Sequence, residues 1–465
     1  MRKIKLEKLF YNNKWLTSNS KSFYKHRTYD GITIEIANCN QIDIKRAILS
    51  ARSGLEKFSE YSNKKKSKIL DIISKRIKNH ANDLAKKECL ELGKHFISAK
   101  KEILACAKLW KHASSLVKKK TKKVINKADF ELLEVQEPIG VVALIIPWNF
   151  PMIVLSERLP YILGAGNSVI IKPSENGSLS IERFMKLINN VGLPEGTINY
   201  LSGDFQTGKK LIKNQNISMI SFTGSTKTGK EIYKNASYTI KRLSLELGGK
   251  NPMIVFEDSN LHKTTRDVIY SFSHNAGQCC VSGSKLFIEK SFFSAFVQTL
   301  IDELNKLNLY QGISTVKQYN KIKKIILQLI KNKVPIVFRS EKLFDDKKRI
   351  IYPIIFNSEK KIDYLEEEIF GPVLLIIKFQ DIDQLIRDIN DTRFGLAALI
   401  WTKNKKKAMY LASKIKFGRI WINGNISQNF PELSIGGFKQ SGLNRETGDS
   451  GLRTYSEIKS IIVNK

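Results

Sequence analysis

The sequence predicts an α/β protein whose core is a doubly wound, mostly parallel sheet. Between residues 139 and 225, four short apolar runs alternate with segments of helical periodicity. The runs are short enough to be parallel strands that are buried on both faces. At 465 residues the chain is also too long for one ordinary hydrophobic core, so we expect two or three folding units.

The predicted strands and the segments around them follow in a regular order. The strands cover residues 139–146, 168–171, 197–201 and 218–222. Helical segments follow them up to residue 163, over 181–190, over 207–213 and onward from 226. Earlier in the chain, apolar residues recur every three or four positions from Ile42 to Leu116, which predicts helices. Residues 130–135 alternate like a half-exposed strand.

Polar side chains stand directly after three of the predicted strands. Asn149 follows the first strand and Ser225 follows the fourth. Lys172 and Glu175 follow the second. Because the carboxyl ends of parallel strands meet at one edge, where open sheets bind ligands, we expect these groups at a common site. Gly224-Ser-Thr-Lys-Thr-Gly229 opens a helix there, although the Gly-x-Gly-x-x-Gly fingerprint is absent from this region.

The formal net charge of +34 raises the question of nucleic-acid binding. Lysine is abundant from end to end, however, and its runs are not interleaved with aromatic residues, so we do not expect nucleic acid as a partner. The run at 139–146 is far shorter than the ~18 residues of a membrane span. Residues 1–10 lack the pattern of a signal peptide, and we therefore expect a cytoplasmic protein without a membrane partner.

The cysteines and histidines give no sign of a disulfide framework or a metal site. Five cysteines, at positions 39, 89, 106, 279 and 280, form no Cys-x-x-Cys pair and suit a reducing compartment. The six histidines are scattered without zinc-ligand spacing. We expect no bound metal.

Six motifs occur in the order in which one known family has them. They are Pro147-Trp-Asn-Phe-Pro151, Lys172-Pro-Ser-Glu175, Phe222-Thr-Gly-Ser225, Leu245-Glu-Leu-Gly-Gly-Lys250, Gly277-Gln-Cys-Cys280 and Glu368-Ile-Phe-Gly-Pro372. Together with Gly436-Gly-Phe-Lys-Gln-Ser-Gly442 and Arg445-Glu446, they resemble the NAD(P)-dependent aldehyde dehydrogenase superfamily, over about residues 10–463. The resemblance implies that the chain oxidises an aldehyde to a carboxylic acid.

The resemblance also implies an architecture of two doubly wound parallel-sheet domains and a small oligomerisation β-arm. The NAD-binding domain would comprise residues 1–117 and 139–245, and the catalytic domain residues 246–440. Residues 118–138 and 450–465 would form the arm. A homodimer or homotetramer is expected, because such an arm supplies strand edges that can pair between copies.

The resemblance implies that Cys280 is the nucleophile. Its thiolate would add to the aldehyde carbon and give a thiohemiacetal, which loses hydride to become a thioester. Asn149 and the backbone N–H of Cys280 would hold the oxyanion. Glu246 would activate the water that hydrolyses the thioester, and its apolar surroundings predict a raised pKa. Cys279 is interpreted as a packing residue.

The same resemblance implies an NAD site. Lys172 and Glu175 would hold the adenosine ribose, and Glu175 favours NAD over NADP because a carboxylate repels a 2′-phosphate. Ser225 begins a helix, which suits the pyrophosphate, although a plain helix cap is the alternative interpretation. The resemblance adds four further cofactor-binding residues, which are Trp148, Gly224, Glu368 and Phe370.

Some interpretations stay open. Arg158 and Glu446 resemble a proton-relay pair but could form a structural ion pair. Glu157 could attract a cationic substrate, be exposed to solvent or pair with Arg158. Residues 434–437 depart from the family pattern near the aldehyde tunnel, which leaves small aliphatic, betaine-type and amino aldehydes as substrates. The rival functions are a coenzyme A-linked relative, disfavoured by Glu246, and a non-catalytic nucleic-acid-binding or structural member.

Overall fold

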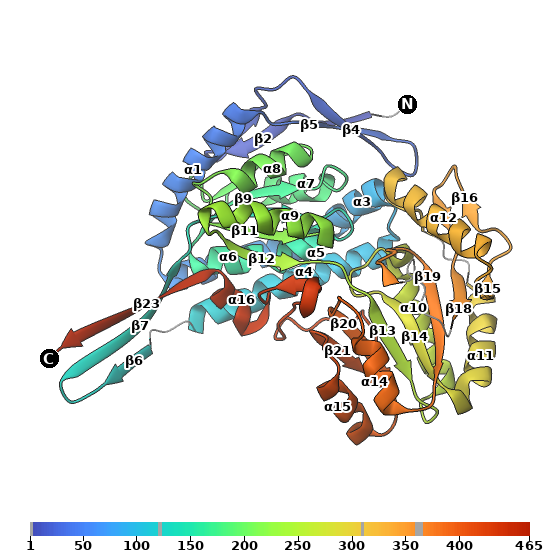
Figure 1. The fold of residues 1–465 in the computed structure, drawn as a ribbon. Helices are drawn as coiled ribbons and strands as arrows, with labels where there is room; N and C mark the ends of the chain where they lie inside the picture. Colours follow the sequence, from blue (N-terminus) through green and yellow to red (C-terminus); the bar gives the residue numbers. More distant parts are fainter. Residues whose placement is uncertain (1–2, 120–122, 308–310, 359–365) are drawn as a thin grey trace.

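Two mostly parallel sheets covered by helices, together with a projecting β-arm, make up most of the fold (Figure 1). The computed structural model describes residues 3–119, 123–307, 311–358 and 366–465. The α/β fold class predicted from the sequence is confirmed. Within the described ranges, no helix is both long enough and apolar enough to cross a membrane.

The first sheet contains the four strands that the apolar runs predict. They are β8 (Val141–Ile146), β9 (Ser168–Pro173), β10 (Ile198–Tyr200) and β11 (Met219–Thr223). The other strands of the sheet are β12 (Arg242–Glu246), β2 (Lys8–Tyr11), β3 (Lys14–Thr17) and β22 (Gly442–Leu443). The order is β22-β12-β11-β8-β9-β10-β2-β3, and the five strands from β12 to β10 are parallel.

Helices surround this sheet. The long N-terminal pattern is resolved into α1 (Gln41–Ser59), α2 (Asn63–Asn79), α3 (Ala81–Leu92) and α4 (Phe96–Lys119). Later helices are α7 (Leu179–Ile188), α8 (Phe205–Lys213) and α9 (Thr226–Ala236). The segment after Asn149 is not one helix but two, α5 (Pro151–Ser156) and α6 (Leu159–Ala165). Pro160 stands in the first turn of α6, where its missing N–H is tolerated, so a new helix begins there.

The second sheet has seven strands in the order β15-β18-β19-β14-β13-β20-β21, and only the β15–β18 pair is antiparallel. The strands are β13 (Asn251–Val255), β14 (Gly283–Glu289), β15 (Ile336–Arg339), β18 (Ile354–Asn357), β19 (Val373–Phe379), β20 (Ala397–Trp401) and β21 (Arg419–Ile422). Its helices are α10 (Leu261–Ser273), α11 (Phe293–Asn305), α12 (Val316–Lys331), α14 (Ile382–Asn390) and α15 (Lys405–Lys414).

Smaller elements complete the body of the molecule. A three-stranded sheet has the order β1 (Lys3–Leu6), β5 (Thr33–Ala37) and β4 (Phe23–Arg27). A two-stranded ribbon pairs β16 (Phe344–Asp345) with β17 (Ile350–Ile351). The short helix α16 (Gly448–Thr454) packs against α6.

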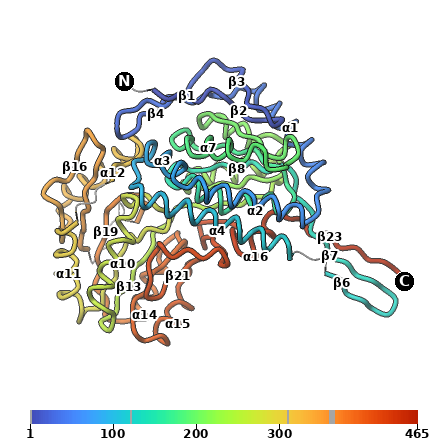
Figure 2. The backbone as a smooth tube through the Cα atoms, turned by 180° about the vertical axis from the view of Figure 1, so that it is seen from behind, coloured from blue at the N-terminus to red at the C-terminus, as the bar shows by residue number. Residues whose placement is uncertain are grey.

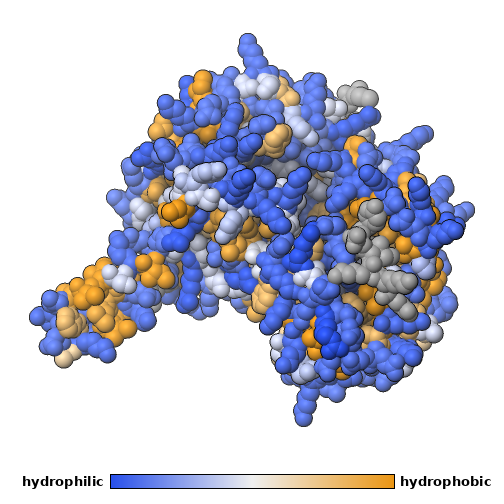
Figure 3. Space-filling view, in the orientation of Figure 1, coloured by the Kyte–Doolittle hydropathy of each residue, from blue (hydrophilic) through white to orange (hydrophobic). Residues whose placement is uncertain are grey.

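The β-arm projects from the body and is visible from both sides (Figures 1 and 2). It consists of β6 (Lys123–Asn126), β7 (Phe130–Pro138) and β23 (Ser456–Asn464), all antiparallel. Residues 120–122 of the predicted arm lie outside the described residues. Apolar side chains gather on its surface (Figure 3), and the exposed large ones are Val124, Ile125, Phe130, Ile458, Ile461, Ile462 and Val463.

Candidate active site

The parallel strands bring the predicted polar residues to one edge of the first sheet. Glu246 is the last residue of β12 and lies opposite Thr223, the last residue of β11. Asn149 and Ser225 follow the ends of the neighbouring strands β8 and β11. Lys172 is the penultimate residue of β9, which pairs with β8. The common edge expected from the sequence is therefore present.

The cysteine pair follows a tight turn, η2 (His274–Gly277), which links α10 to β14. Asn275 and Ala276 have φ values of 53° and 55°, and Gly277 has a φ of 69°. A Cβ on Gly277 would lie 2.4 Å from the backbone of Gly371, so this position requires glycine. Left-handed backbone at a non-glycine residue is costly and is typical of functional sites. Asn275 was not singled out from the sequence, although asparagine tolerates this conformation better than most non-glycine residues.

Hydrogen bonds join this turn to Asn149. The amide nitrogen of Asn149, Nδ2, donates to the backbone oxygen of Gln278 at 3.1 Å. Nδ2 of Asn275 donates to the backbone oxygen of Asn149 at 3.4 Å. The side chain of Gln278 is held as well, because its Oε1 accepts from the backbone N–H of Ser314 at 2.9 Å. The amide of Asn149 is thus fixed beside the segment that carries Cys280, with one of its two N–H groups used.

Cys280 is surrounded by groups that keep its thiol protonated. Its hydrogen bond with Cys279 and its burial raise the pKa of Cys280 well above the ordinary value, and the charges of Glu157 and Glu246 add to this shift. Cys279 therefore contacts the candidate nucleophile besides packing against the core. A thiol in this environment needs a base, or a new positive charge nearby, before it can attack a substrate.

Glu246 has the properties of such a base. Its side chain is buried, and its Oε1 has no hydrogen-bond partner among the described residues. Burial raises the pKa of Glu246 to about 8; Arg158 opposes this shift, and Glu446 and Glu157 reinforce it. A carboxyl group with such a pKa can exchange protons near neutral pH.

Arg158 lies at the break between α5 and α6 and contacts two carboxylates loosely. Its Nε is 3.7 Å from Oε1 of Glu446, and its Nη1 is 3.6 Å from Oε2 of Glu157. The hydroxyl of Tyr455 donates to Oε1 of Glu446 at 2.8 Å, and Ser244 donates to the same oxygen. The structure thus contains the ion pair of Arg158 with Glu446 and also the pairing of Glu157 with Arg158.

Lys172 and Glu175 are neighbours at the end of β9. Nζ of Lys172 donates to the backbone oxygen of Pro173 at 2.8 Å and lies 3.6 Å from Oε2 of Glu175. Burial lowers the pKa of Lys172, although Glu175 opposes the shift. Across the edge, Oγ of Ser225 accepts from the backbone N–H of Thr228 at 3.2 Å and caps α9. The capping interpretation of Ser225 is confirmed, and the start of α9 still favours an anion.

Gly224 and Gly248 keep two parts of this edge free of side chains. A Cβ on Gly224 would lie 2.5 Å from the ring of Phe222. A Cβ on Gly248 would lie 2.4 Å from Oε2 of Glu368. Free helix N–H groups, a carboxylate and a narrow glycine-lined edge are the features that a dinucleotide site needs, so these residues fit NAD.

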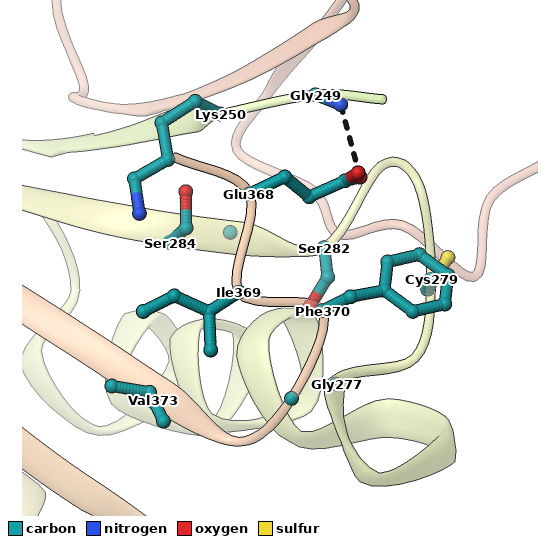
Figure 4. A pocket seen from close by; sticks show the side chains of 12 residues that line it. Gly249, Lys250, Gly277, Cys279, Ser282, Ser284, Glu368, Ile369, Phe370 and Val373 are labelled. Atoms are coloured by element: carbon teal, nitrogen blue, oxygen red, sulfur yellow. Dashed lines mark hydrogen bonds between the residues drawn. The ribbon is translucent and has the colours of Figure 1, made fainter. Parts of the chain in front are cut away.

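Glu368 and Phe370 line a pocket formed by the segments that lead into β13, β14 and β19 of the second sheet (Figure 4). The backbone N–H of Gly249 donates to Oε1 of Glu368 at 3.2 Å. Phe370 has a φ of 61° and meets Trp148 edge to face, with ring centroids 5.8 Å apart. Lys250 lines the same pocket, and burial lowers its pKa to about 7. The sequence motif contains Lys250, but nothing in it indicated a shifted pKa.

Arg419 is a charged residue near the reaction centre that sequence reasoning missed. It begins β21, and its Nη1 donates to Oδ1 of Asn429 at 3.2 Å. Its charge interacts with those of Glu157, Glu246 and Cys280, while burial lowers its pKa. Arg419 belongs to none of the quoted motifs, so only the fold reveals its position.

Comparisons with known proteins agree with this geometry. Residues 15–461 match the model of the family described as "Aldehyde dehydrogenase family". The chain is 33% identical to aldehyde dehydrogenase [NAD(P)+] 2 of Saccharomyces cerevisiae over 492 aligned positions, which cover 98% of this chain and 94% of the relative. It is 32% identical to the betaine aldehyde dehydrogenase of Bacillus subtilis, covering 91% and 90%.

Solved structures give the same result. The NAD-dependent aldehyde dehydrogenase from Sinorhizobium meliloti superposes with a TM-score of 0.94 at 32% identity, covering 99% of this chain and 95% of that one. A betaine aldehyde dehydrogenase variant from Staphylococcus aureus, in complex with NAD+ and with a BME-modified cysteine, gives 0.94 at 29% identity, covering 98% and 96%. The motifs and the fold match, and the alignments cover nearly the whole of both chains. The chain therefore belongs to the aldehyde dehydrogenase family.

Proposed function

We propose that this protein oxidises an aldehyde to the carboxylic acid with NAD, through a thioester on Cys280 that a Glu246-activated water hydrolyses. One observation carries the proposal. Asn149, Glu246 and the Cys280 turn are distant in the sequence but meet at one sheet edge, where the amide of Asn149 bonds to the turn and the charge of Glu246 acts on Cys280. The substrate class includes small aliphatic, betaine-type and amino aldehydes.

The first half-reaction needs the thiolate of Cys280. A carboxylate at Glu246 can take the thiol proton, because burial brings its pKa to about 8 and its charge acts on Cys280. Glu246 releases this proton to solvent water before the second half-reaction, so that it is again a base for hydrolysis. The sulfur then forms a bond to the aldehyde carbon, and the carbonyl oxygen becomes an oxyanion. The second N–H of Asn149 and the backbone N–H of Cys280 are the donors for that oxyanion.

The second half-reaction releases the acid. After the hydride has left the substrate carbon, a thioester joins that carbon to Cys280. Glu246 accepts a proton from water as the water oxygen adds to the thioester carbon, and collapse of this adduct expels the thiolate of Cys280. The products are the carboxylic acid and the free enzyme.

NAD would supply the hydride acceptor. Lys172 and Glu175 suit the adenosine ribose, the start of α9 at Ser225 suits the pyrophosphate, and Glu175 disfavours a 2′-phosphate. Trp148, Glu368 and Phe370 suit the nicotinamide end, because Glu368 and Phe370 line the pocket before β13, β14 and β19 and the ring of Trp148 meets that of Phe370.

We also propose that the β-arm joins copies of this chain into a homo-oligomer in the cytoplasm. The arm has apolar exposed side chains on β6, β7 and β23, and both of its outer strands have an unpaired edge within the described part of the chain. Sedimentation would test this. Ile458→Lys with Ile462→Lys should lower the oligomeric state, whereas a monomeric wild type would contradict the proposal.

The test of the activity follows NADH by absorbance with a panel of aldehydes. Wild type should turn over, and Cys280→Ala should be inactive. Glu246→Gln should form at most one equivalent of NADH, more slowly than wild type, and then stall. Added coenzyme A should leave the product a free acid, since Glu246 directs hydrolysis. Full activity of Cys280→Ala, or no NADH from any aldehyde, would overturn the mechanism.

A further inference from the structure

Arg419 is a cation close to the reaction centre that the proposed mechanism does not use. It is the first residue of β21 and pairs across the sheet with Ala397, the first residue of β20. The backbone N–H of Ala397 donates to Oδ1 of Asn251 at 3.0 Å. Nδ2 of Asn251 donates in turn to the backbone oxygen of Cys280 at 2.8 Å. Two hydrogen bonds and one strand pairing therefore join Arg419 to Cys280.

The segment that follows β21 connects Arg419 to Glu246 as well. Nη2 of Arg419 donates to the backbone oxygen of Ser434 at 3.4 Å. Further along the same segment, Gly442 pairs with Glu246 at the end of β12, and a Cβ on Gly442 would lie 3.5 Å from Oε1 of Glu246. The charge of Arg419 accordingly interacts with those of both Glu246 and Cys280. Arg419 thus lies beside the place where a substrate would react.

The guanidinium of Arg419 is accessible, and its contacts are with neutral oxygens. Nη1 donates to Oδ1 of Asn429 at 3.2 Å, and Nη2 makes long contacts with the backbone oxygens of Leu433 and Ser434, at 3.5 and 3.4 Å. No carboxylate of the described residues forms an ion pair with it. Because Arg419 is half-buried rather than sealed in the core, a ligand can reach it.

The nearby carboxyl groups are matched by other means. Oε2 of Glu157 lies 3.6 Å from Nη1 of Arg158, and Oε1 of Glu446 lies 3.7 Å from Nε of the same arginine. Burial raises the pKa of Glu246 to about 8, so this group is mostly uncharged at neutral pH. Arg419, in contrast, has no opposite charge in contact. A partly buried cation in this state favours an anionic ligand.

We propose that Arg419 binds a carboxylate at the far end of the substrate, so that the aldehyde oxidised at Cys280 is an aliphatic aldehyde with a terminal carboxylate. This inference rests on the proposed dehydrogenase function and narrows its substrate class. The carboxylate accepts charge-assisted hydrogen bonds from the guanidinium, which replace the long contacts with Leu433 and Ser434. The product is a dicarboxylic acid. An ammonium group at the same end is disfavoured, because it would meet a like charge.

The kinetic test compares isosteric substrates. 4-Oxobutanoate and 4-methylpentanal differ in two carboxylate oxygens against two methyl groups, and 5-oxopentanoate with 5-methylhexanal is the pair one carbon longer. In at least one pair, wild type should have the higher kcat/KM for the carboxylate. Arg419→Gln should lower that ratio of carboxylate to neutral substrate about tenfold or more, because an amide supplies no charge. Any effect of the lost charge on Cys280 or Glu246 is shared by both members of a pair and cancels in the ratio.

Two results would overturn the proposal. The first is a wild type that prefers the neutral aldehyde in both pairs, or that oxidises 3-aminopropanal better than either carboxylate. The second is an Arg419→Gln protein whose ratio equals that of wild type. Should this variant not fold, Arg419→Lys takes its place. It should lower the ratio by about threefold, because an ammonium group lacks the planar fork that matches a carboxylate, and an unchanged ratio would contradict the contact.

Arg76→Gln is the matched control. Arg76 is also half-buried, and it also donates to neutral backbone oxygens, those of Leu187 at 2.6 Å and Asn190 at 2.8 Å, but it lies on α2. Its substitution removes the same charge from the protein and should leave the ratio as in wild type. An equal fall of the ratio in Arg76→Gln and Arg419→Gln would show that net charge, rather than a contact with Arg419, sets the preference.

Binding can be measured without turnover. In the Cys280→Ala protein, ligand-detected NMR should show butanoate or pentanoate bound and n-butylammonium unbound. Adding Arg419→Gln should remove the carboxylate signal, and adding Arg76→Gln should leave it. This result would support the site even if no aldehyde were oxidised, so failure of the dehydrogenase proposal is distinguishable from failure of the site. If neither carboxylate bound to a folded Cys280→Ala protein, the site would be contradicted directly.

Discussion

Two buried groups of charged residues flank the reaction centre, and they are built in opposite ways. The Arg158 cluster contains Arg158, Glu157, Glu246 and Glu446. Its ion-pair distances to Arg158 are 3.6 and 3.7 Å, so the arginine balances charge without binding either carboxylate tightly. The pKa values of all three carboxyl groups are raised by burial.

The Lys94 cluster contains Lys94, Glu88, Glu102 and His274, and its contacts are short. Nζ of Lys94 lies 2.6 Å from both Glu88 and Glu102. Burial would lower the pKa of Lys94, but the two carboxylates raise it. The pKa of Glu102 is lowered in spite of burial. The ion pair of Lys94 with Glu102 is thus held in its charged form.

The difference shows how the same residue types serve different purposes. Loose contacts leave Glu246, whose pKa is about 8, able to change protonation near neutral pH, which a general base requires. Short hydrogen bonds make the Lys94 cluster a fixed support that ties α3 and α4 to the catalytic turn through His274. We therefore expect substitutions in the first cluster to change rates and pH dependence, and those in the second to change stability.

The largest expected effect is that of Glu246→Gln in the Arg158 cluster. The amide cannot accept a proton from water, so thioester hydrolysis should fall about 10²- to 10⁴-fold. The free energy of unfolding should fall little, because Glu246 has a hydrogen-bond-free oxygen rather than a tight ion pair. Acyl-enzyme lifetime, followed by quenching and intact-protein mass spectrometry, measures the first quantity. A short lifetime in this variant would show that another group is the base.

Lys94→Met should produce the next largest effect, on stability. It leaves Glu88 and Glu102 buried without their counter-charge, which typically costs about 3–5 kcal/mol of unfolding free energy. Urea denaturation of both proteins measures the loss. Lys186→Met is the control, because the Lys186–Glu182 pair has a lysine 49% exposed and should contribute less than about 1 kcal/mol. Equal losses of unfolding free energy in the two variants would contradict the expectation that the buried pair contributes more than the surface pair.

The sequence indicated the Arg158 cluster more clearly than the Lys94 cluster, and the reason is physical. Asn149 follows an apolar strand and Glu246 ends another, and both residues lie in recognisable motifs. Arg158 and Glu446 were singled out as a pair only through the family resemblance. Their loose contact depends on α6 starting anew at residue 159, which the helical pattern did not indicate.

The Lys94 cluster could not be found from the sequence. Its members come from α3, the α3–α4 connection, α4 and the end of α10, and His274 is 172 positions from Glu102 in the chain. The hydrophobic periodicity of a single segment does not indicate such a contact, because the contact forms only when the catalytic turn packs against α4. Arg419 was not identified from the sequence for the same reason, since only tertiary packing brings it near Cys280.

The pH dependence of hydrolysis should follow the Arg158 cluster. A general base must be deprotonated, and burial raises the pKa of Glu246 to about 8. The hydrolysis rate should therefore rise about tenfold per pH unit below 8 and level off above it. Rapid-quench measurement of acyl-enzyme decay between pH 6 and 10 tests this. A flat profile in wild type would mean that Glu246 is already ionised at neutral pH; Glu246→Gln should be flat in any case.

The smallest effect expected is a shift of that profile in Glu446→Gln. The negative charge of Glu446 helps to raise the pKa of Glu246, so its removal should move the midpoint below 8, by about one pH unit or less. Glutamine can still accept from Tyr455 and Ser244, which preserves the local packing. A purely electrostatic role changes the midpoint and leaves the plateau rate above it intact. A proton-relay role lowers the plateau itself, because an amide cannot pass the proton on. The same profile measured on Glu432→Gln, which changes an exposed glutamate 14 positions before Glu446, should be unchanged.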